Sequence, residues 1–229
     1  MIKPVILGIE TATSACSVAL LIHDTIIQRF QIAPARHAEL ILTMVDSILQ
    51  EANIALTQLD AIAFGKGPGS FMGIRLAVGV AQGLGLGGQV PLIAVSTLHA
   101  LAQTAYQKSP TKTPLLVGWD ARMRRIYWGA YQLDVEKQSK VLLPILKDTL
   151  NFPEDIDPPS VEDDWTLIGN AWDIYQDSVL EILRKKYKTV LTSIYPEASA
   201  VAFIAQSLYR EGKKILAEQA EPCYLRKTL

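Results

Sequence analysis

The alternation of apolar and polar residues predicts three strands at the start of the chain. Apolar runs cover residues 5–10, 16–22 and 25–32, and the polar pair His23-Asp24 between the last two runs is typical of a hairpin turn. A helix is predicted over residues 36–52, because its apolar residues recur at helical spacing. The residues of this stripe are Leu40, Ile41, Met44, Val45, Ile48, Leu49 and Ala52.

The next apolar run, residues 61–64, leads into the glycine-rich segment 65–70, which reads GKGPGS. Pro68 fixes its own φ, and the glycines on either side reach backbone angles that are costly for other residues. Ser70 is a good N-cap for a helix that continues to Gly88. A strand, a tight turn and a helix in this order direct backbone N–H groups toward an anion.

The known nucleotide motifs do not fit this segment. A P-loop needs Ser or Thr after its lysine, but Gly67 follows Lys66, and a dinucleotide fingerprint needs glycine where Met72 stands. A nucleophile elbow needs glycine at Pro68. The spacing G-x-G-x-x-G does occur at residues 83–88, but it lies at the end of a helix and before a strand. We therefore favour a tight strand-to-helix connection over phosphate binding.

The remaining pattern predicts a second half that restarts in strands after a proline-containing linker at 108–114. Strands are predicted at 92–95, 115–120, 125–133, 165–168 and 189–194, helices at 96–106 and 197–211, and an exposed loop at 151–164; residues 141–150 stay open. The order β-β-β-α-β-α-β-α is that of the actin-like ATPase and sugar-kinase superfold, an α/β fold of two lobes with mixed sheets flanked by helices. The lobes would be 1–107, joined by the returning helix, and 108–229. Such an analogy carries no function.

Composition narrows the function classes. The chain has 229 residues, 49% of them hydrophobic, and a net charge of −1 from 22 basic and 23 acidic residues. Strong direct nucleic-acid binding needs a basic surface, so only a local patch at Arg122, Arg124 and Arg125 stays open. Cys16 and Cys223 lack paired spacing, which indicates reduced thiols and no metal cluster. No signal peptide or membrane-length run is apparent, so we expect a cytoplasmic protein without membrane contact.

Two acidic residues stand at predicted strand ends. One hypothesis is that Glu10 and Asp120 are the paired carboxylates of an actin-like cleft, where they would hold magnesium and polarise water. Thr11, Gly67 and Gly69 would line the same nucleotide cleft. The alternative is that each acid accepts hydrogen bonds from nearby backbone, and the absence of a phosphate loop favours this alternative. The histidines, His23, His37 and His99, show no metal-ligand spacing. We therefore expect no cofactor, and the five residues form at most a vestigial nucleotide cleft.

The helix over residues 70–88 is rich in small residues, namely Gly73, Ala77, Gly79, Ala81, Gly83, Gly85 and Gly87. Each interior glycine costs about 1 kcal/mol relative to alanine, so a close neighbour should offset the cost. That neighbour is either the chain's own core or a partner helix. For a partner, spacing places Phe71, Arg75, Val78 and Gln82 on one face beside Gly79. Val78→Arg would then abolish complex formation and leave the chain folded.

Five segments in order resemble the bacterial TsaB family, formerly called YeaZ. They are 9–20 (IETATSACSVAL), 37–40 (HAEL), 65–75 (GKGPGSFMGIR), 119–122 (WDAR) and 224–226 (YLR). The sequence departs from the family at Glu10, where Asp is commoner, and at Met72, where Thr is usual. The loss of a hydroxyl at Met72 argues against a phosphate contact there.

The resemblance implies a role in forming N6-threonylcarbamoyladenosine at position 37 of tRNAs that read codons starting with A. It implies a non-catalytic scaffold that binds a TsaD-like catalytic paralogue, with a TsaE-like ATPase as further partner and tRNA reached through the complex. The paralogue's His-x-x-x-His pair corresponds to Thr97 and Leu101, so the metal site is missing here. A homodimer through the same helix face stays open. The alternative function is an ATP-dependent phosphotransferase or ATPase that uses Glu10 and Asp120.

Overall fold

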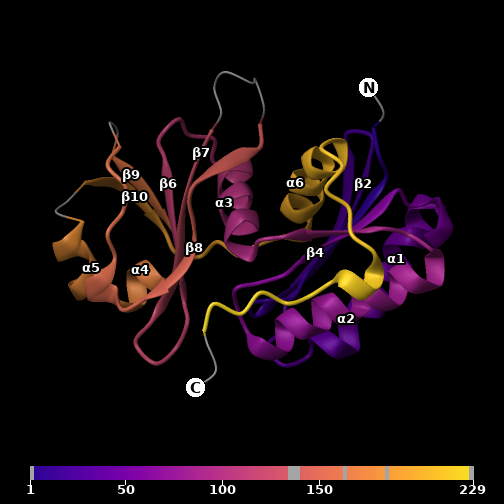
Figure 1. Ribbon diagram of the computed structural model, residues 1–229, viewed down its shortest axis with the longest axis horizontal. Helices are drawn as coiled ribbons and strands as arrows, with labels where there is room; N and C mark the ends of the chain where they lie inside the picture. The colour runs from indigo at the N-terminus through magenta and orange to yellow at the C-terminus, as the bar shows by residue number, and fades with distance from the viewer. Residues whose placement is uncertain (1–2, 134–139, 162–163, 184–185, 227–229) are drawn as a thin grey trace. The chain divides into compact units, whose positions relative to one another are not determined.

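The computed structural model describes residues 3–133, 140–161, 164–183 and 186–226, which form two compact units (Figure 1). Unit 1 comprises Met1–Ala100 and Pro196–Cys223, and unit 2 comprises Leu101–Tyr195 and Tyr224–Leu229. The boundary after Ala100 lies within helix α3 (Thr97–Lys108), before residue 107, where the sequence pattern ended the first lobe. Each unit contains one sheet.

The sheet of unit 1 has the strand order β3-β2-β1-β4-β5. Its strands are β1 (Ile6–Glu10), β2 (Ala15–Ile22), β3 (Thr25–Ile32), β4 (Ala61–Gly65) and β5 (Leu92–Val95). The first three form the predicted antiparallel meander, and β1, β4 and β5 run parallel. Every residue of β1 and β4 is buried, which explains why both read as continuous apolar runs.

Helices cover both faces of this sheet. Helices α1 (His37–Ala52) and α2 (Phe71–Gly88) pack on the face that carries Leu7 and Ile9, whereas α6 (Ala198–Arg210) packs against Gly8 on the other (Figure 1). Ser70 is the N-cap of α2, as predicted, and its Oγ accepts the N–H of Gly73 at 3.4 Å. Among the described residues, α2 is the one helix with the length and apolar composition of a membrane span, which is weak support for one because core helices share these properties.

The sheet of unit 2 has the order β10-β9-β6-β7-β8. Its strands are β6 (Leu115–Asp120), β7 (Ile126–Leu133), β8 (Leu142–Asn151), β9 (Trp165–Ile168) and β10 (Tyr187–Leu191). Two short helices, α4 (Ala171–Ile174) and α5 (Gln176–Ile182), lie between β9 and β10 in the chain. Trp128, Trp165 and Trp172 lie in its core. The segment 141–150, to which the sequence pattern assigned no element, is thus mostly a strand.

Two predictions for unit 2 were wrong at their bounds. The strand placed at 189–194 starts earlier, because the ring of Tyr187 packs against the tryptophan core and draws the strand into the sheet. The loop predicted at 151–164 contains a short 3-10 helix, Pro153–Asp155, and Ile156 is 1% exposed, so part of the segment is core. Residues 162–163 of that loop and 227–229 of the tail lie outside the described residues.

Candidate functional site

The turn after β1 and the glycine turn after β4 are interlocked in unit 1. The N–H of Ser70 donates to the carbonyl of Ala12 at 2.7 Å, and the hydroxyl of Thr11 donates to the carbonyl of Gly73 at 2.7 Å. A Cβ on Gly69 would overlap the carbonyl oxygen of Ala12, and one on Gly73 would overlap that of Thr11. These glycines therefore permit close approach of two backbone segments, and a backbone carbonyl lies where α2 begins.

Gly67 holds the same junction together from its other side. Its φ is 98°, a conformation that favours glycine, and its carbonyl accepts the N–H of Thr97 at 2.9 Å. A Cβ on Gly67 would lie 2.7 Å from Cδ1 of Ile74. The structure thus places Glu10, Thr11, Gly67 and Gly69 at one junction of unit 1. The contacts themselves are those of a tight strand-to-helix connection.

Glu10 is fully buried at the centre of this junction. Its Oε1 accepts the N–H of Ala12 at 2.7 Å, and its Oε2 accepts the hydroxyl of Thr97 at 3.1 Å. Desolvation raises the pKa of Glu10 from 4.5 to about 7, against the opposing effect of these hydrogen bonds. Gly65 has no room for a Cβ because the carboxylate lies against it. The favoured interpretation, an acid bonded to local backbone, describes Glu10 well.

Asp120 makes the same kind of contacts in unit 2. Its Oδ1 accepts the N–H of Arg122 at 2.9 Å and the hydroxyl of Tyr175 at 2.8 Å, and its own N–H donates to Asn170. Burial, followed by the hydrogen bond to Asp120, raises the pKa of Tyr175 to about 12. Asp120 therefore orders the start of the β6–β7 hairpin.

The arginines of the candidate basic patch lie in the β6–β7 hairpin. Arg122, Met123 and Arg124 have φ values of 62°, 53° and 54°, so three consecutive non-glycine residues are left-handed. Arg226 supports this turn, because its Nη2 donates to the carbonyl of Ala121 at 2.8 Å. Acids accompany the patch: Arg122 lies 3.5 Å from Asp120, and Arg124 lies 3.9 Å from Glu154. Arg125 stacks on the ring of Phe152.

The two positions that correspond to the paralogue's histidines are part of the core. Thr97 is 2% exposed and donates to Glu10, and Leu101 is 1% exposed. His37 has Nε2 3.2 Å from the carbonyl oxygen of Ala15, and the N–H of His99 donates to Ser96. Among the described residues, no three His, Cys, Asp or Glu side chains are grouped to hold a metal.

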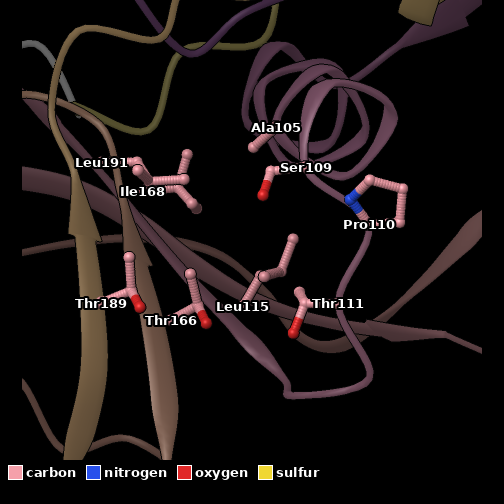
Figure 2. A pocket seen from close by; sticks show the side chains of 9 residues that line it. All are labelled: Ala105, Ser109, Pro110, Thr111, Leu115, Thr166, Ile168, Thr189 and Leu191. Carbon is pink, nitrogen blue, oxygen red and sulfur yellow. The ribbon is translucent and has the colours of Figure 1, made fainter.

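Unit 2 also contains a cavity of about 240 Å³ that the sequence did not predict (Figure 2). Its nine lining residues are Ala105, Ser109, Pro110, Thr111, Leu115, Thr166, Ile168, Thr189 and Leu191. Four of them carry hydroxyls and none is ionisable, so the lining offers hydrogen bonds but no general acid, base or strong metal ligand. They come from α3, from the segment that follows it and from three strands, and no local motif joins such segments.

The small residues of α2 divide into two groups. Gly73, Ala77, Ala81 and Gly85 are buried inside unit 1. For Gly79, Gly83 and Gly87, by contrast, no described residue outside the adjoining helix backbone would come within 4 Å of an added Cβ. Packing inside the chain thus explains one group and leaves the other unexplained.

The exposed side of α2 is termed here the outer face, defined by Met72, Arg75, Gly79, Gly83 and Leu86. Met72 is 71% exposed and Leu86 is 64% exposed. Phe71 adjoins this face, with its ring 3.7 Å from the guanidinium carbon of Arg75. The outer face is therefore mainly apolar, with one cation and with no side chain at its two glycines.

Two residues of the predicted interface are not on the outer face. Val78 is 5% exposed and lies in the core, and Gln82 is half-buried, with its side-chain N–H groups donating to the carbonyls of Ala217 and Ala220. Phe71, Arg75, Val78 and Gln82 do share one side of the helix, but that side is the border between the buried and exposed faces. Periodicity could not show this, because α2 is apolar on nearly all sides. Val78→Arg would therefore disrupt folding rather than test docking.

Comparison with known proteins identifies the family. A family model described as "TsaD: tRNA N6-adenosine threonylcarbamoyltransferase" matches residues 26–228. The "tRNA threonylcarbamoyladenosine biosynthesis protein TsaB" of Escherichia coli is 38% identical, over 96% of this chain and 94% of that protein. Its namesake in Haemophilus influenzae is 33% identical over 96% and 93%.

A solved structure agrees with these sequence relatives. "YeaZ from Pseudomonas aeruginosa" is 35% identical, with a TM-score of 0.86 over 97% of this chain and 100% of that one. This likeness confirms the predicted fold class, the α/β actin-like superfold with two mixed sheets flanked by helices. By sequence and by structure, the chain belongs to the TsaB (YeaZ) family of tRNA threonylcarbamoyladenosine biosynthesis proteins.

Proposed function

We propose that the chain is a non-catalytic scaffold subunit of the complex that forms N6-threonylcarbamoyladenosine at position 37 of tRNA. It binds a TsaD-type catalytic subunit through the outer face of α2. The observation that carries the proposal is the row of Gly79, Gly83 and Gly87, which no packing within the described residues explains.

Energetics favours a partner at this row. Each exposed glycine costs the helix about 1 kcal/mol relative to alanine, and the cost persists without benefit in the isolated chain. A second helix that crosses at close range would gain contact with the backbone there, because interaxial distance depends on side-chain size. Met72 and Leu86, both more than half exposed, would be covered in the same step.

The non-catalytic part of the proposal is supported by how the candidate acids and metal positions are used. Glu10 accepts hydrogen bonds from Ala12 and Thr97, and Asp120 accepts them from Arg122 and Tyr175. Both oxygens of the buried Glu10 carboxyl already accept hydrogen bonds, so a magnesium ion there would have to displace these partners. Thr97 and Leu101 leave no histidine pair for a metal.

The other partners follow from this role. A TsaE-like ATPase and tRNA would meet this chain in the assembled complex in the cytoplasm, with tRNA held mainly by other subunits. In the absence of the catalytic subunit, two copies of this chain would pair through their outer faces and form a homodimer.

The test is light-scattering chromatography of the chain alone and mixed with the TsaD-type protein from the same source, with ATP hydrolysis assayed on each peak. We expect a one-to-one complex and an inert lone chain. Gly83→Arg should abolish the complex and leave the fold intact, because the side chain projects from the outer face. Gln107→Arg, at an exposed position of α3, is the matched control and should bind normally.

Two results would contradict the proposal. Normal binding by Gly83→Arg would mean that the interface does not lie on the outer face. ATP turnover by the lone chain that is lost in Glu10→Ala would instead support the alternative, a phosphotransferase or ATPase of the same superfold.

A further inference from the structure

The C-terminal segment 215–223, termed here the strap, lies along α2 in unit 1 (Figure 1). One end is paired with β5: Ile215 and Leu92 exchange two backbone hydrogen bonds of 2.9 Å. The other end is held by the N–H of Cys223, which donates to the carbonyl of Lys66 at 2.7 Å. Between them, Ala217 and Ala220 are buried in the core of unit 1.

Gln82 joins the middle of the strap to α2. Its Nε2 donates to the carbonyl of Ala217 at 3.1 Å and to that of Ala220 at 3.2 Å. A side-chain amide has two N–H donors, and both find acceptors here. Gln82 and Arg75 are the two polar side chains of α2.

The packing of α2 shows why such a tie matters. From Ala77 onward its buried residues are Ala77, Val78, Ala81, Gly85 and Gly88, and Val78 alone among these has more than a Cβ. Val80 and Leu84 are partly buried and also pack against the core. Ridges of side chains that enter grooves normally determine how a helix is rotated on its neighbour. In this part of α2 the large side chains that pack against the core are Val78, Val80 and Leu84, so hydrogen bonds at its flank add to a small set of contacts that orient the helix.

Gln82 is also close to the outer face. It lies three residues after Gly79 and four before Leu86, and both spacings place side chains next to each other on a helix. The strap therefore runs along the border of the surface to which we assign partner docking. A small rotation of α2 would turn Gly79 and Gly83 away from an incoming helix.

We propose that Gln82 is a positioning residue for complex formation: by bonding the strap to α2, it holds the helix in the rotation that presents the outer face. This inference rests on the proposed docking of the TsaD-type subunit at α2. Gln82 itself makes no contact with the partner in this scheme; it acts through Gly79, Gly83 and Leu86.

The experiment compares Gln82→Ala with a matched glutamine in unit 2. Gln103 is fully buried and also makes two hydrogen bonds to backbone, donating to the carbonyl of Lys140 and accepting from the N–H of Leu142. For both alanine variants and the wild type, we would measure the dissociation constant with the TsaD-type protein, the urea midpoint, and amide exchange of residues 215–223.

We expect Gln82→Ala to weaken binding about tenfold and to speed amide exchange in the strap, which corresponds to the loss of one or two hydrogen bonds. Gln103→Ala should lower the urea midpoint at least as much and leave binding within about twofold of wild type. Gln82→Glu, which keeps the length but places a carboxylate against two carbonyls, should weaken binding at least as strongly as alanine.

Three outcomes would overturn the inference. Binding of Gln82→Ala within about twofold of wild type would remove the positioning role and leave the docking proposal intact. If Gln103→Ala loses binding equally, the effect of Gln82→Ala would reflect a general loss of stability and not a positioning role. Failure of the wild-type chain to bind would overturn the proposed function, and this inference with it.

Discussion

The hydroxyl of Thr97 donates to the carboxylate of Glu10, with 3.1 Å between the two oxygen atoms, and both side chains are buried. Thr97 begins α3 and Glu10 ends β1, so the bond joins two elements that are far apart in sequence. The bond therefore uses both candidate metal-site residues. Glu10 is the candidate acid, Thr97 stands at the position of a histidine in the catalytic paralogue, and each is the hydrogen-bond partner of the other.

The raised pKa of Glu10 predicts how stability depends on pH. The folded state holds the proton up to about pH 7, whereas the unfolded chain releases it near pH 4.5, so this contribution is fully present below pH 4.5 and is lost as the pH rises through 7. Glu10→Gln mimics the protonated acid and can still accept the N–H of Ala12. At pH 8 it should be more stable than wild type, by on the order of 3 kcal/mol at most.

The measurement is urea unfolding of both proteins at pH 4.5 and pH 8. Glu221→Gln, at an exposed position, is the control and should leave the pH dependence of wild type unchanged. A lower free energy of unfolding for Glu10→Gln at pH 8 would mean that the ionised carboxylate is the stabilising form.

The glycines of α2 predict opposite effects on stability and on binding. Gly83→Ala should raise the free energy of unfolding of the lone chain by about 1 kcal/mol, because the site has open space, and should weaken the complex with the TsaD-type protein. Gly85→Ala should lower the free energy of unfolding by about 1 kcal/mol, because its Cβ would lie 2.8 Å from Cδ2 of Leu92 and 3.1 Å from the carbonyl of Val90. Urea unfolding and titration with the partner check both; unchanged binding by Gly83→Ala would contradict close helix contact there.

The hairpin of unit 2 predicts a structural role for the C-terminal arginine. Arg226→Ala removes donors to the carbonyls of Ala121 and Arg122 beside three left-handed residues, so it should lower the stability of unit 2 by about 1–3 kcal/mol. Hydrogen exchange of the hairpin amides is the measurement, with Lys147→Ala as an exposed control. If the hairpin amides exchange at the wild-type rate in Arg226→Ala, these bonds do not hold the turn.

The interface prediction for α2 failed because the sequence does not show which face of the helix points to the core. Ser70, the glycine turn and the first three strands were predictable because caps, turns and alternation act within a few residues. Val78 was misplaced because α2 has apolar residues on nearly every side, so periodicity shows a helix but not its rotation. The short helices α4 and α5 were missed, since segments of 4 and 7 residues carry little periodic signal.

The sequence alone was sufficient for the family, the fold class and most of the longer local elements, because ordered motifs and hydrophobic spacing lie along the chain itself. Only the tertiary structure showed that Gly85 serves the core while Gly83 faces outward, that Glu10 is desolvated, and that Gln82 is bonded to the strap. These properties depend on which distant segments come into contact. Gly83 and Gly85 are identical in chemistry and two residues apart, and only their surroundings distinguish them.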